Sequence, residues 1–115
     1  MPSPPLIPDD GPVDFDHLRR MTLDDSSLER EVLAMFAGQA AELAAALAQL
    51  PPDAATLAHK LKGSARAIGA VHVAAAAADL ETALRNGSDA AEPRAALNLA
   101  ITQACKAINA ILRRS

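Results

Sequence analysis

Aromatic residues are almost missing from this chain of 115 residues, which has two phenylalanines, Phe15 and Phe36, and no tryptophan or tyrosine. Strands favour aromatic and β-branched residues in alternation with polar ones, and no such alternation is present. Half of the residues are apolar, and most of these are Ala, Leu, Ile and Val, with long alanine runs. Because alanine is the best helix former and lets helices pack closely, the composition predicts an all-α domain.

Other classes of protein are disfavoured by further absences. Cys105 is the single cysteine, so the chain has no disulfide framework and no cluster of thiolate metal ligands. The net charge is −3, with 11 basic and 14 acidic residues spread along the chain, whereas nucleic-acid binding requires a basic stripe. No uninterrupted apolar run approaches the roughly 20 residues that span a bilayer, and the amino terminus lacks the features of a signal peptide. We therefore expect no nucleic-acid or membrane association and a cytoplasmic location.

Proline marks the amino-terminal segment. Residues 1–12, MPSPPLIPDDGP, contain five prolines, which remove backbone donors and oppose helix formation. We predict a flexible tail over residues 1–12 and one domain over residues 13–115, a usual length for a single domain. Within that domain, VDFDHLRRM is predicted to form a short leading helix.

Four longer helices are predicted after it. The first follows a cap at Asp25 or Ser26 and ends before Pro51-Pro52, since a residue before proline avoids helical geometry. Its predicted core stripe is Leu28, Val32, Met35, Phe36, Leu43, Ala46 and Leu50. The second runs from a cap at Asp53 to Gly69, the third ends at Asn86-Gly87, and the last has Pro93 in its first turn. Short links place neighbouring helices antiparallel, so the expected fold is an up-down-up-down four-helix bundle with a short extra amino-terminal helix.

The stretch TLAHKLKGSARAIGA, residues 56–70, places polar side chains on one face of the second long helix. At about 100° per residue, Leu57, Leu61, Ser64, Ala65 and Ile68 fall on the inner side of this helix. The opposite, outward side carries His59, Lys62, Gly63, Arg66 and Ala70. A mid-helix glycine costs about 1 kcal/mol relative to alanine, so Gly63 indicates a requirement other than helix stability.

Two interpretations of this outward face compete. Solvent-exposed polar residues without a function are common, and a surface histidine is usually one of them. The alternative explains three features together. A neutral imidazole offers a ring nitrogen as a nucleophile, a lysine one turn away supplies positive charge for a phosphoryl group, and glycine leaves room for a partner's surface. The combination of His59, Lys62 and Gly63 favours this second, chemical interpretation.

The segment AHKLKGSARAIGA resembles the signature of histidine-containing phosphotransfer (HPt) domains, in which His, any residue and Leu-Lys-Gly-Ser are followed by small residues up to a Gly. The similarity extends to LEREVLAMFAGQAAEL before the motif and ADLETALRNG after it. The resemblance implies that His59 is the phosphoryl acceptor, through Nε2, and that Lys62 stabilises phosphate charge. It also implies that a Glu or Gln on the next helix contacts the histidine or its phosphate.

Antiparallel register predicts which side chains face one another across the helices. A turn at Gly69-Ala70 places Glu81 level with His59, although a solvated glutamate at this position is an equal alternative. A turn at Pro51-Pro52 places Gln39 level with Ser64, and we predict a structural contact between these two side chains. Gly63, Arg66 and Ala70 are predicted to belong to the docking surface for a receiver domain, with simple solvation the alternative for Arg66.

The predicted function is that of a monomeric carrier that relays a phosphoryl group between aspartates of response-regulator receiver domains. A hybrid sensor histidine kinase is a further candidate partner. Mg²⁺ is expected to be held by the receiver and not by this chain, and the absence of a Gly-rich phosphate loop predicts no ATP-dependent kinase activity. The Asp14 and His17 pair has a metal-like spacing that we interpret as accidental. Alternatives are a docking module that carries no phosphate, and the dimerising histidine domain of a kinase.

Overall fold

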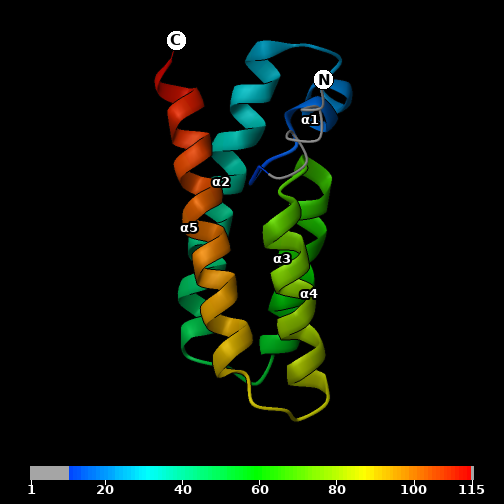
Figure 1. The fold of residues 1–115 in the computed structure, drawn as a ribbon, viewed down its shortest axis with the longest axis vertical. Helices are drawn as coiled ribbons and strands as arrows, with labels where there is room; N and C mark the ends of the chain where they lie inside the picture. The colour runs from blue at the N-terminus through cyan, green and yellow to red at the C-terminus, as the bar shows by residue number, and fades with distance from the viewer. Residues whose placement is uncertain (1–10, 115) are drawn as a thin grey trace, which may run out of the picture.

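The computed structural model describes residues 11–114 and is all-helical over this range, as the composition predicted. Its five helices are α1 (Phe15–Met21), α2 (Ser26–Ala48), α3 (Ala54–Ile68), α4 (Val71–Arg85) and α5 (Ala91–Arg113). Figure 1 shows α2 to α5 side by side along the long axis of the molecule, with α1 at one end. The predicted flexible tail falls outside the described residues as far as residue 10. Gly11 and Pro12 are half-buried, and Val13 already belongs to the core.

Local sequence signals account for several helix ends. The Asp25 carboxylate accepts a hydrogen bond from Leu28 N at 3.0 Å, so Asp25 and not Ser26 caps α2. Asp14 caps α1 in the same way through His17 N. Asp53 occupies the capping position of α3 without a side-chain hydrogen bond. Gly69 ends α3 in the left-handed conformation, with φ of 84°, as glycine does at many helix ends.

The four long helices form a closed set of neighbours, in which α2 packs on α3, α3 on α4, α4 on α5 and α5 on α2. Two arginines, one at each end of the α2–α5 pair, donate hydrogen bonds from one helix to backbone carbonyls of the other. Arg30, near the start of α2, donates to the carbonyls of Ile111 and Leu112 near the end of α5, at 3.3 and 2.7 Å. Arg94, near the start of α5, donates to the carbonyl of Ala48 at the end of α2. Each arginine therefore bonds carbonyls in the last turn of the partner helix, where backbone acceptors lack helical partners, although the Ile111 carbonyl also accepts from Arg114 N.

The buried face of α2 differs from the predicted stripe. Phe36 is buried as expected, but Leu28 and Met35 are 41% and 71% exposed. The fully or nearly fully buried residues of this helix are Leu33, Phe36, Ala40 and Leu47. The prediction was wrong for Leu28 and Met35 because α2 has apolar residues on more than one face, and contacts with α3 and α5 select the face between them. It was also wrong for Leu50, which is exposed because α2 ends at Ala48.

Helix α1 is fastened to the turn between α3 and α4. Asp14 N donates to Gly69 O at 2.7 Å, and His17 Nε2 donates to Ala67 O at 3.1 Å. Leu18 is fully buried beneath the helix. An added Cβ at Gly69 would lie 2.8 Å from Asp14 O and 3.3 Å from a carbon of the His17 ring. The glycine is thus required both by its positive φ and by the close approach of α1.

Two of the helices, Ser26–Ala48 and Ala91–Arg113, are long and apolar enough to cross a membrane by length and composition alone. Neither helix is an uninterrupted apolar run of that length, since polar residues such as Glu42 and Lys106 interrupt them, and their high mean hydropathy comes largely from alanine. In the bundle, α2 packs against α3 and α5, and α5 packs against α4 and α2. Such helices are weak grounds for a membrane protein, since core helices of soluble proteins meet the same criteria.

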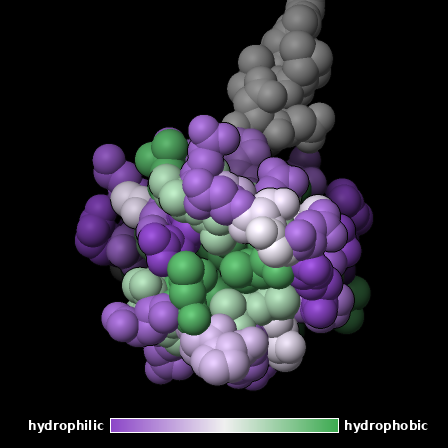
Figure 2. Space-filling model, turned by 90° about the horizontal axis from the view of Figure 1, so that it is seen from below, coloured by the Kyte–Doolittle hydropathy of each residue, from purple (hydrophilic) through white to green (hydrophobic). Residues whose placement is uncertain are grey.

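The end of the bundle opposite α1 is formed by the α2–α3 and α4–α5 links. Figure 2 looks onto this end and shows hydrophobic surface at the centre with hydrophilic residues around it. Leu50, in the α2–α3 link, is 42% exposed and has a positive φ of 44°. Within the described chain, α1 covers one end of the bundle and no helix covers the other (Figure 1).

Candidate functional site

Helix α3 has one buried face and one exposed face, as the periodicity predicted. Ala58, Leu61, Ala65 and Ile68 are buried, whereas His59 projects into solvent with 62% of its side chain exposed. Gly63 and Arg66 are also exposed. The helix contains three cations, Lys60, Lys62 and Arg66, and no acidic residue, in a chain with a net charge of −3. The exposed face of α3 is therefore a basic surface on an acidic protein.

Glu81 of α4 is the centre of a charged cluster beside His59. Its carboxylate oxygens lie 3.1 and 3.2 Å from His59 Nδ1, and Oε1 accepts a hydrogen bond from Lys62 Nζ at 2.8 Å. Oε2 accepts a second charged hydrogen bond from Arg85 Nε at 2.9 Å. Glu81 is 9% exposed, so three cationic or potentially cationic groups converge on one nearly buried carboxylate. The predicted level position of Glu81 and His59 is thus present as a direct contact.

The electrostatic consequence for Glu81 is large. The hydrogen bond from Lys62 lowers its pKa most, that from Arg85 lowers it next, and that from His59 contributes further. Burial acts in the opposite direction, yet the pKa of Glu81 falls from 4.5 to about 2. The carboxylate is therefore ionised at neutral pH and accepts hydrogen bonds from all its neighbours.

The two nitrogens of His59 are in different situations. A carboxylate can only accept, so the bond to Glu81 places a hydrogen on Nδ1. Among the described residues, Nε2 makes no hydrogen bond, and the exposed side chain leaves it accessible. A histidine with a hydrogen on Nδ1 and a free lone pair on Nε2 is an imidazole prepared to act as a nucleophile through Nε2.

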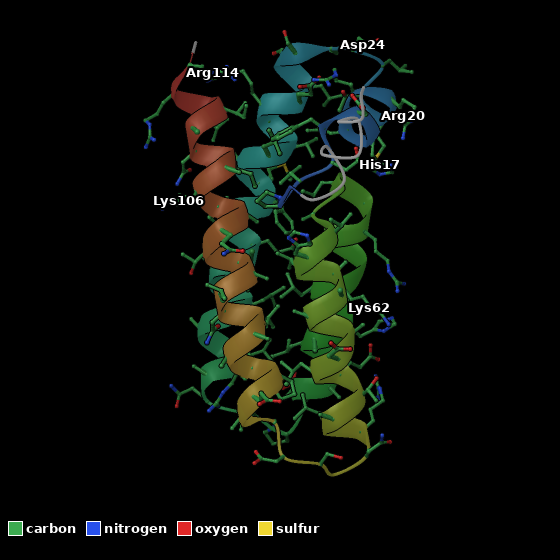
Figure 3. All side chains as sticks on the ribbon, viewed as in Figure 1. His17, Arg20, Asp24, Lys62, Lys106 and Arg114 are labelled. Atoms are coloured by element: carbon green, nitrogen blue, oxygen red, sulfur yellow. The ribbon has the colours of Figure 1, made fainter. Side chains whose placement is uncertain are left out.

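Lys62 is less exposed than the sequence suggested. Its side chain is 18% exposed, and its ammonium donates a hydrogen bond to Glu81. Figure 3 shows Lys62 on the side of the molecule formed by α3 and α4. The positive charge is therefore held close to His59 by a fixed carboxylate instead of extending freely into solvent. Sequence reasoning missed Arg85, the second cation on Glu81. Its position four residues after Glu81 on the same helix was a usable signal, because side chains at this spacing are neighbours.

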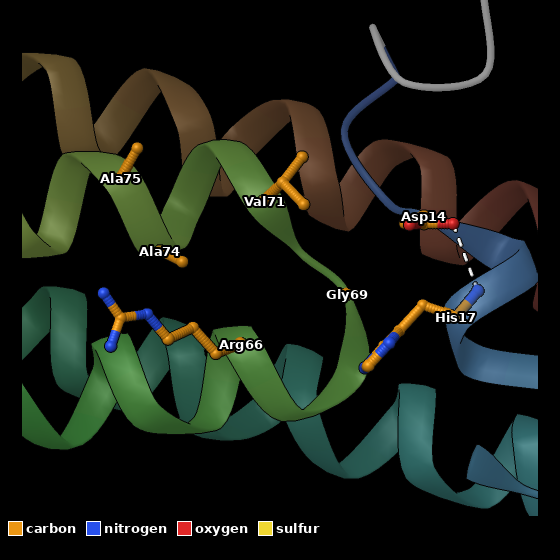
Figure 4. Close-up of a pocket in the computed structure, with 7 residues that line it drawn as sticks. All are labelled: Asp14, His17, Arg66, Gly69, Val71, Ala74 and Ala75. Carbon is orange, nitrogen blue, oxygen red and sulfur yellow. Dashed lines mark hydrogen bonds between the residues drawn. The ribbon is translucent and has the colours of Figure 1, made fainter. Parts of the chain in front are cut away.

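The residues predicted to form a docking surface are not all accessible. A Cβ added to Gly63 would meet no atom within 4 Å, so the surface above this glycine is open. Arg66 is exposed and lines a groove with residues of α1 and α4, among them His17 and Val71 (Figure 4). Ala70, however, is fully buried. Its predicted exposure was wrong because α3 ends at Ile68, and the left-handed Gly69 turns Ala70 inward as the residue that precedes α4.

Gln39 and Ser64 line the same groove between α2 and α3, as the antiparallel register predicted. Within the part of the chain that the structure describes, no hydrogen bond joins their side chains, so the predicted polar contact is not present. Both residues are half-exposed instead of buried. The requirement that a buried polar group find a protein partner therefore does not apply to either of them.

The remaining candidate residues have local structural roles. Asp14 and His17, whose spacing resembled a metal site, are engaged in the cap of α1 and in the contact with Ala67. The described residues include no group of three or more His, Cys, Asp or Glu side chains suited to a metal ion. Cys105 packs beside the core, and burial raises the pKa of its thiol.

The depressed pKa of Glu81 predicts a pH dependence of stability. A carboxyl group whose pKa falls on folding stabilises the native state above its ordinary pKa of 4.5, and this contribution disappears as the pH falls towards 2. Glu81→Gln should therefore lower the urea midpoint of unfolding at pH 7, and the difference from wild type should shrink between pH 4.5 and 2. Urea titrations followed by circular dichroism test this, with the exposed Glu42→Gln as control. A difference that is constant with pH would contradict the assignment.

Comparison with known proteins agrees with the arrangement of these helices. The family model described as Hpt domain matches residues 31–111, which include α3, α4 and most of α2 and α5, and exclude α1. Neither the search of curated proteins nor the search of solved structures found a match. The family match extends over well more than half of the chain and includes the exposed histidine with its neighbouring cation. The chain therefore belongs to the Hpt domain family, the helical phosphocarrier modules of two-component phosphorelays.

Proposed function

We propose that this chain is a histidine phosphotransfer protein in which His59 receives a phosphoryl group from the aspartyl phosphate of one receiver domain and passes it to another. The observation that carries this proposal is the asymmetry of the His59 ring. Its Nδ1 contacts Glu81 at 3.1 and 3.2 Å, and its Nε2 is directed away from that contact on an exposed side chain. Nε2 is therefore the nitrogen that an approaching phosphorus atom can reach.

In the proposed step, the lone pair of Nε2 forms a bond to phosphorus while the bond from phosphorus to the aspartate oxygen breaks. The aspartate leaves as a carboxylate with the electron pair of that bond. The hydrogen on Nδ1 stays in its hydrogen bond to Glu81, whose negative charge offsets the positive charge that develops on the ring. In the reverse direction the ring leaves as a neutral imidazole, so transfer to a second receiver requires no proton to enter or leave the site.

Lys62 and Arg85 supply positive charge near the transferred group. Both are bonded to Glu81, at 2.8 and 2.9 Å, and so lie on either side of the carboxylate that contacts the ring. Phosphoryl transfer depends chiefly on positioning and charge stabilisation. Mg²⁺ is assigned in this proposal to the acidic pocket of the receiver, and the phosphoryl donor is the receiver and not ATP.

The proposal includes an up-down-up-down antiparallel bundle as the scaffold for this chemistry. The antiparallel direction is supported by contacts between the opposite ends of α2 and α5 and by the pairing of residues 59 and 81 across the α3–α4 turn. The proposal also has the protein act as a monomer in the cytoplasm. A single bundle leaves the whole exposed face of α3 available to one receiver at a time. The basic charge of that face is complementary to the acidic pocket in which a receiver holds its phosphoaspartate.

A phosphotransfer profile tests the proposal. Receiver domains phosphorylated on aspartate with labelled acetyl phosphate, and then freed of the reagent, are each mixed with the purified chain. We expect at least one receiver to transfer label to the chain in an acid-labile, base-stable form, which is the behaviour of phosphohistidine. A chain that binds a receiver without ever acquiring label would instead be a docking module, and the proposal would fail.

A further inference from the structure

An open groove lies between the start of α4 and the carboxyl-terminal half of α5, and no residue of α3 lines it. Its volume is about 500 Å³, and its lining residues are Pro12, His72, Gln103, Lys106 and Ala107. Lys106 is positively charged, His72 can become so, and none of the lining residues is acidic. Among the described residues Lys106 forms no ion pair, and Figure 3 shows it on the half of α5 nearer α1. The groove therefore attracts negative charge and has none of its own.

The amino-terminal segment joins the domain at this groove. Val13 is buried in the core, which fixes the position of Pro12 beside the groove. Residues 1–10, MPSPPLIPDD, end in two carboxylates, Asp9 and Asp10. Two negative charges therefore precede, by two and three positions, a residue that lines a basic groove. This arrangement is one of charge complementarity between a segment of the chain and the surface next to it.

An exposed leucine continues the same face of α5. Leu99 is 60% exposed and is the most exposed of the large apolar residues of this helix. It lies about one turn before Gln103 and about two turns before Lys106. At about 100° per residue, the three side chains fall within about 60° of one another on the circumference of α5. The basic groove is thus followed, along α5, by apolar surface.

The amino-terminal segment has the length and composition to reach that surface. Leu6 and Ile7 precede Pro12 by six and five positions, which is about 15–20 Å in extended proline-rich geometry. Leu99 is about 10 Å from Lys106 along the helix axis. Prolines on both sides of the Leu-Ile pair fix the backbone φ angle, so that ordering the segment costs less conformational entropy than for an ordinary chain.

The order of the chemical groups is the same on the segment and on the surface. Going away from Pro12, the segment has carboxylates first and apolar side chains next, and the surface has basic groups first and Leu99 next. We infer that residues 6–10 lie along the α4–α5 face of their own chain, with the two carboxylates beside Lys106 and the Leu-Ile pair against Leu99. The segment is then a strap that covers apolar surface and leaves the exposed face of α3 accessible.

Proteolysis of the full chain tests this inference. Proteinase K can cut between Leu6 and Ile7 only when the strap is detached, so the rate of this cut reports the detached population. Each rate is divided by that of the free peptide of residues 1–12 with the same sequence. Cuts confined to this segment distinguish release of the strap from unfolding of the bundle. We expect the wild-type chain to be cut at least about tenfold more slowly than the peptide.

Two variants remove the proposed contacts, and two others are their matched controls. Lys106→Glu and Leu99→Asp should each raise the relative cleavage rate by at least about threefold, since each destabilises only the attached state. Arg113→Glu and Leu28→Asp change exposed residues of the same kinds outside the groove and should alter the rate by less than about 1.5-fold.

A charge exchange provides the decisive comparison. Adding Asp9→Lys and Asp10→Lys to Lys106→Glu should restore most of the protection, because opposite charges again face one another. Wild-type cleavage at the rate of the free peptide would overturn the inference, as would equal rates for Lys106→Glu and Arg113→Glu or a charge exchange without recovery. Protection that increases with protein concentration would place the segment in the groove of a second copy and would also overturn it.

Discussion

Replacing His59 with glutamine is expected to abolish phosphoryl uptake from every receiver and from phosphoramidate. Glutamine keeps a polar side chain of similar length on the exposed face of α3, but its amide has no nucleophilic ring nitrogen. The labelled fraction should fall below about one thousandth of wild type, because loss of a covalent acceptor removes the reaction pathway itself. Quantitative labelling with isotopic phosphate measures this, and helical content by circular dichroism should remain unchanged since His59 is largely exposed.

His72→Gln is the matched control for that experiment. His72 is also exposed and lies at the start of α4, but it belongs neither to the Glu81 cluster nor to the groove between α2 and α3. The control should be labelled at the wild-type rate. Residual acid-labile label on His59→Gln, together with its loss on His72→Gln or His17→Gln, would place the acceptor on a different histidine.

Among the glycines at positions 38, 63, 69 and 87, replacement of Gly69 by alanine should cause the largest loss of stability. Two costs add at this position. A side chain at φ of 84° costs about 1–2 kcal/mol, and the new Cβ would lie only 2.8 Å from Asp14 O, so α1 must move away. The free energy of unfolding from urea titration should therefore fall by about 2–4 kcal/mol.

Gly87→Ala separates the two costs. Gly87 also has a positive φ, of 69°, but an added Cβ there meets nothing within 4 Å. Its loss of stability should reflect the backbone conformation alone and be smaller than that of Gly69→Ala. Equal losses for the two variants would show that the contact of α1 with the α3–α4 turn does not contribute to the stability of the fold.

The sequence predicted the surroundings of His59 well because the relevant signals are short-range. Helix α3 has one strongly apolar face, so the direction of His59 followed from periodicity alone. The α3–α4 turn is tight and is marked by Gly69. Pairing residues at similar distances before and after this turn correctly placed Glu81 beside His59. The error for Ala70 arose from continuing the helical geometry past the residue that ends the helix.

Longer-range features were less accessible. Helix α2 has apolar residues around most of its circumference, and the choice of Leu33 over Met35 as a core residue depends on how α3 and α5 approach it. The packing of Gln39 and Ser64 depends in turn on the separation of α2 and α3, which periodicity does not fix. The attachment of α1 uses backbone acceptors of residues 67 and 69, and no hydrophobic periodicity marks which groups of α1 will reach them.

That attachment ties together two parts of the chain that would otherwise open independently. The last carbonyls of a helix usually fray towards water, yet those of Ala67 and Gly69 are bonded to His17 and Asp14. The carboxyl end of α3 can therefore loosen only when α1 detaches, and amide hydrogen exchange in the two segments becomes a single cooperative event. Local fluctuation at the carboxyl end of the helix that carries His59 is thus limited by a short helix that lies outside the part of the chain shared with the family.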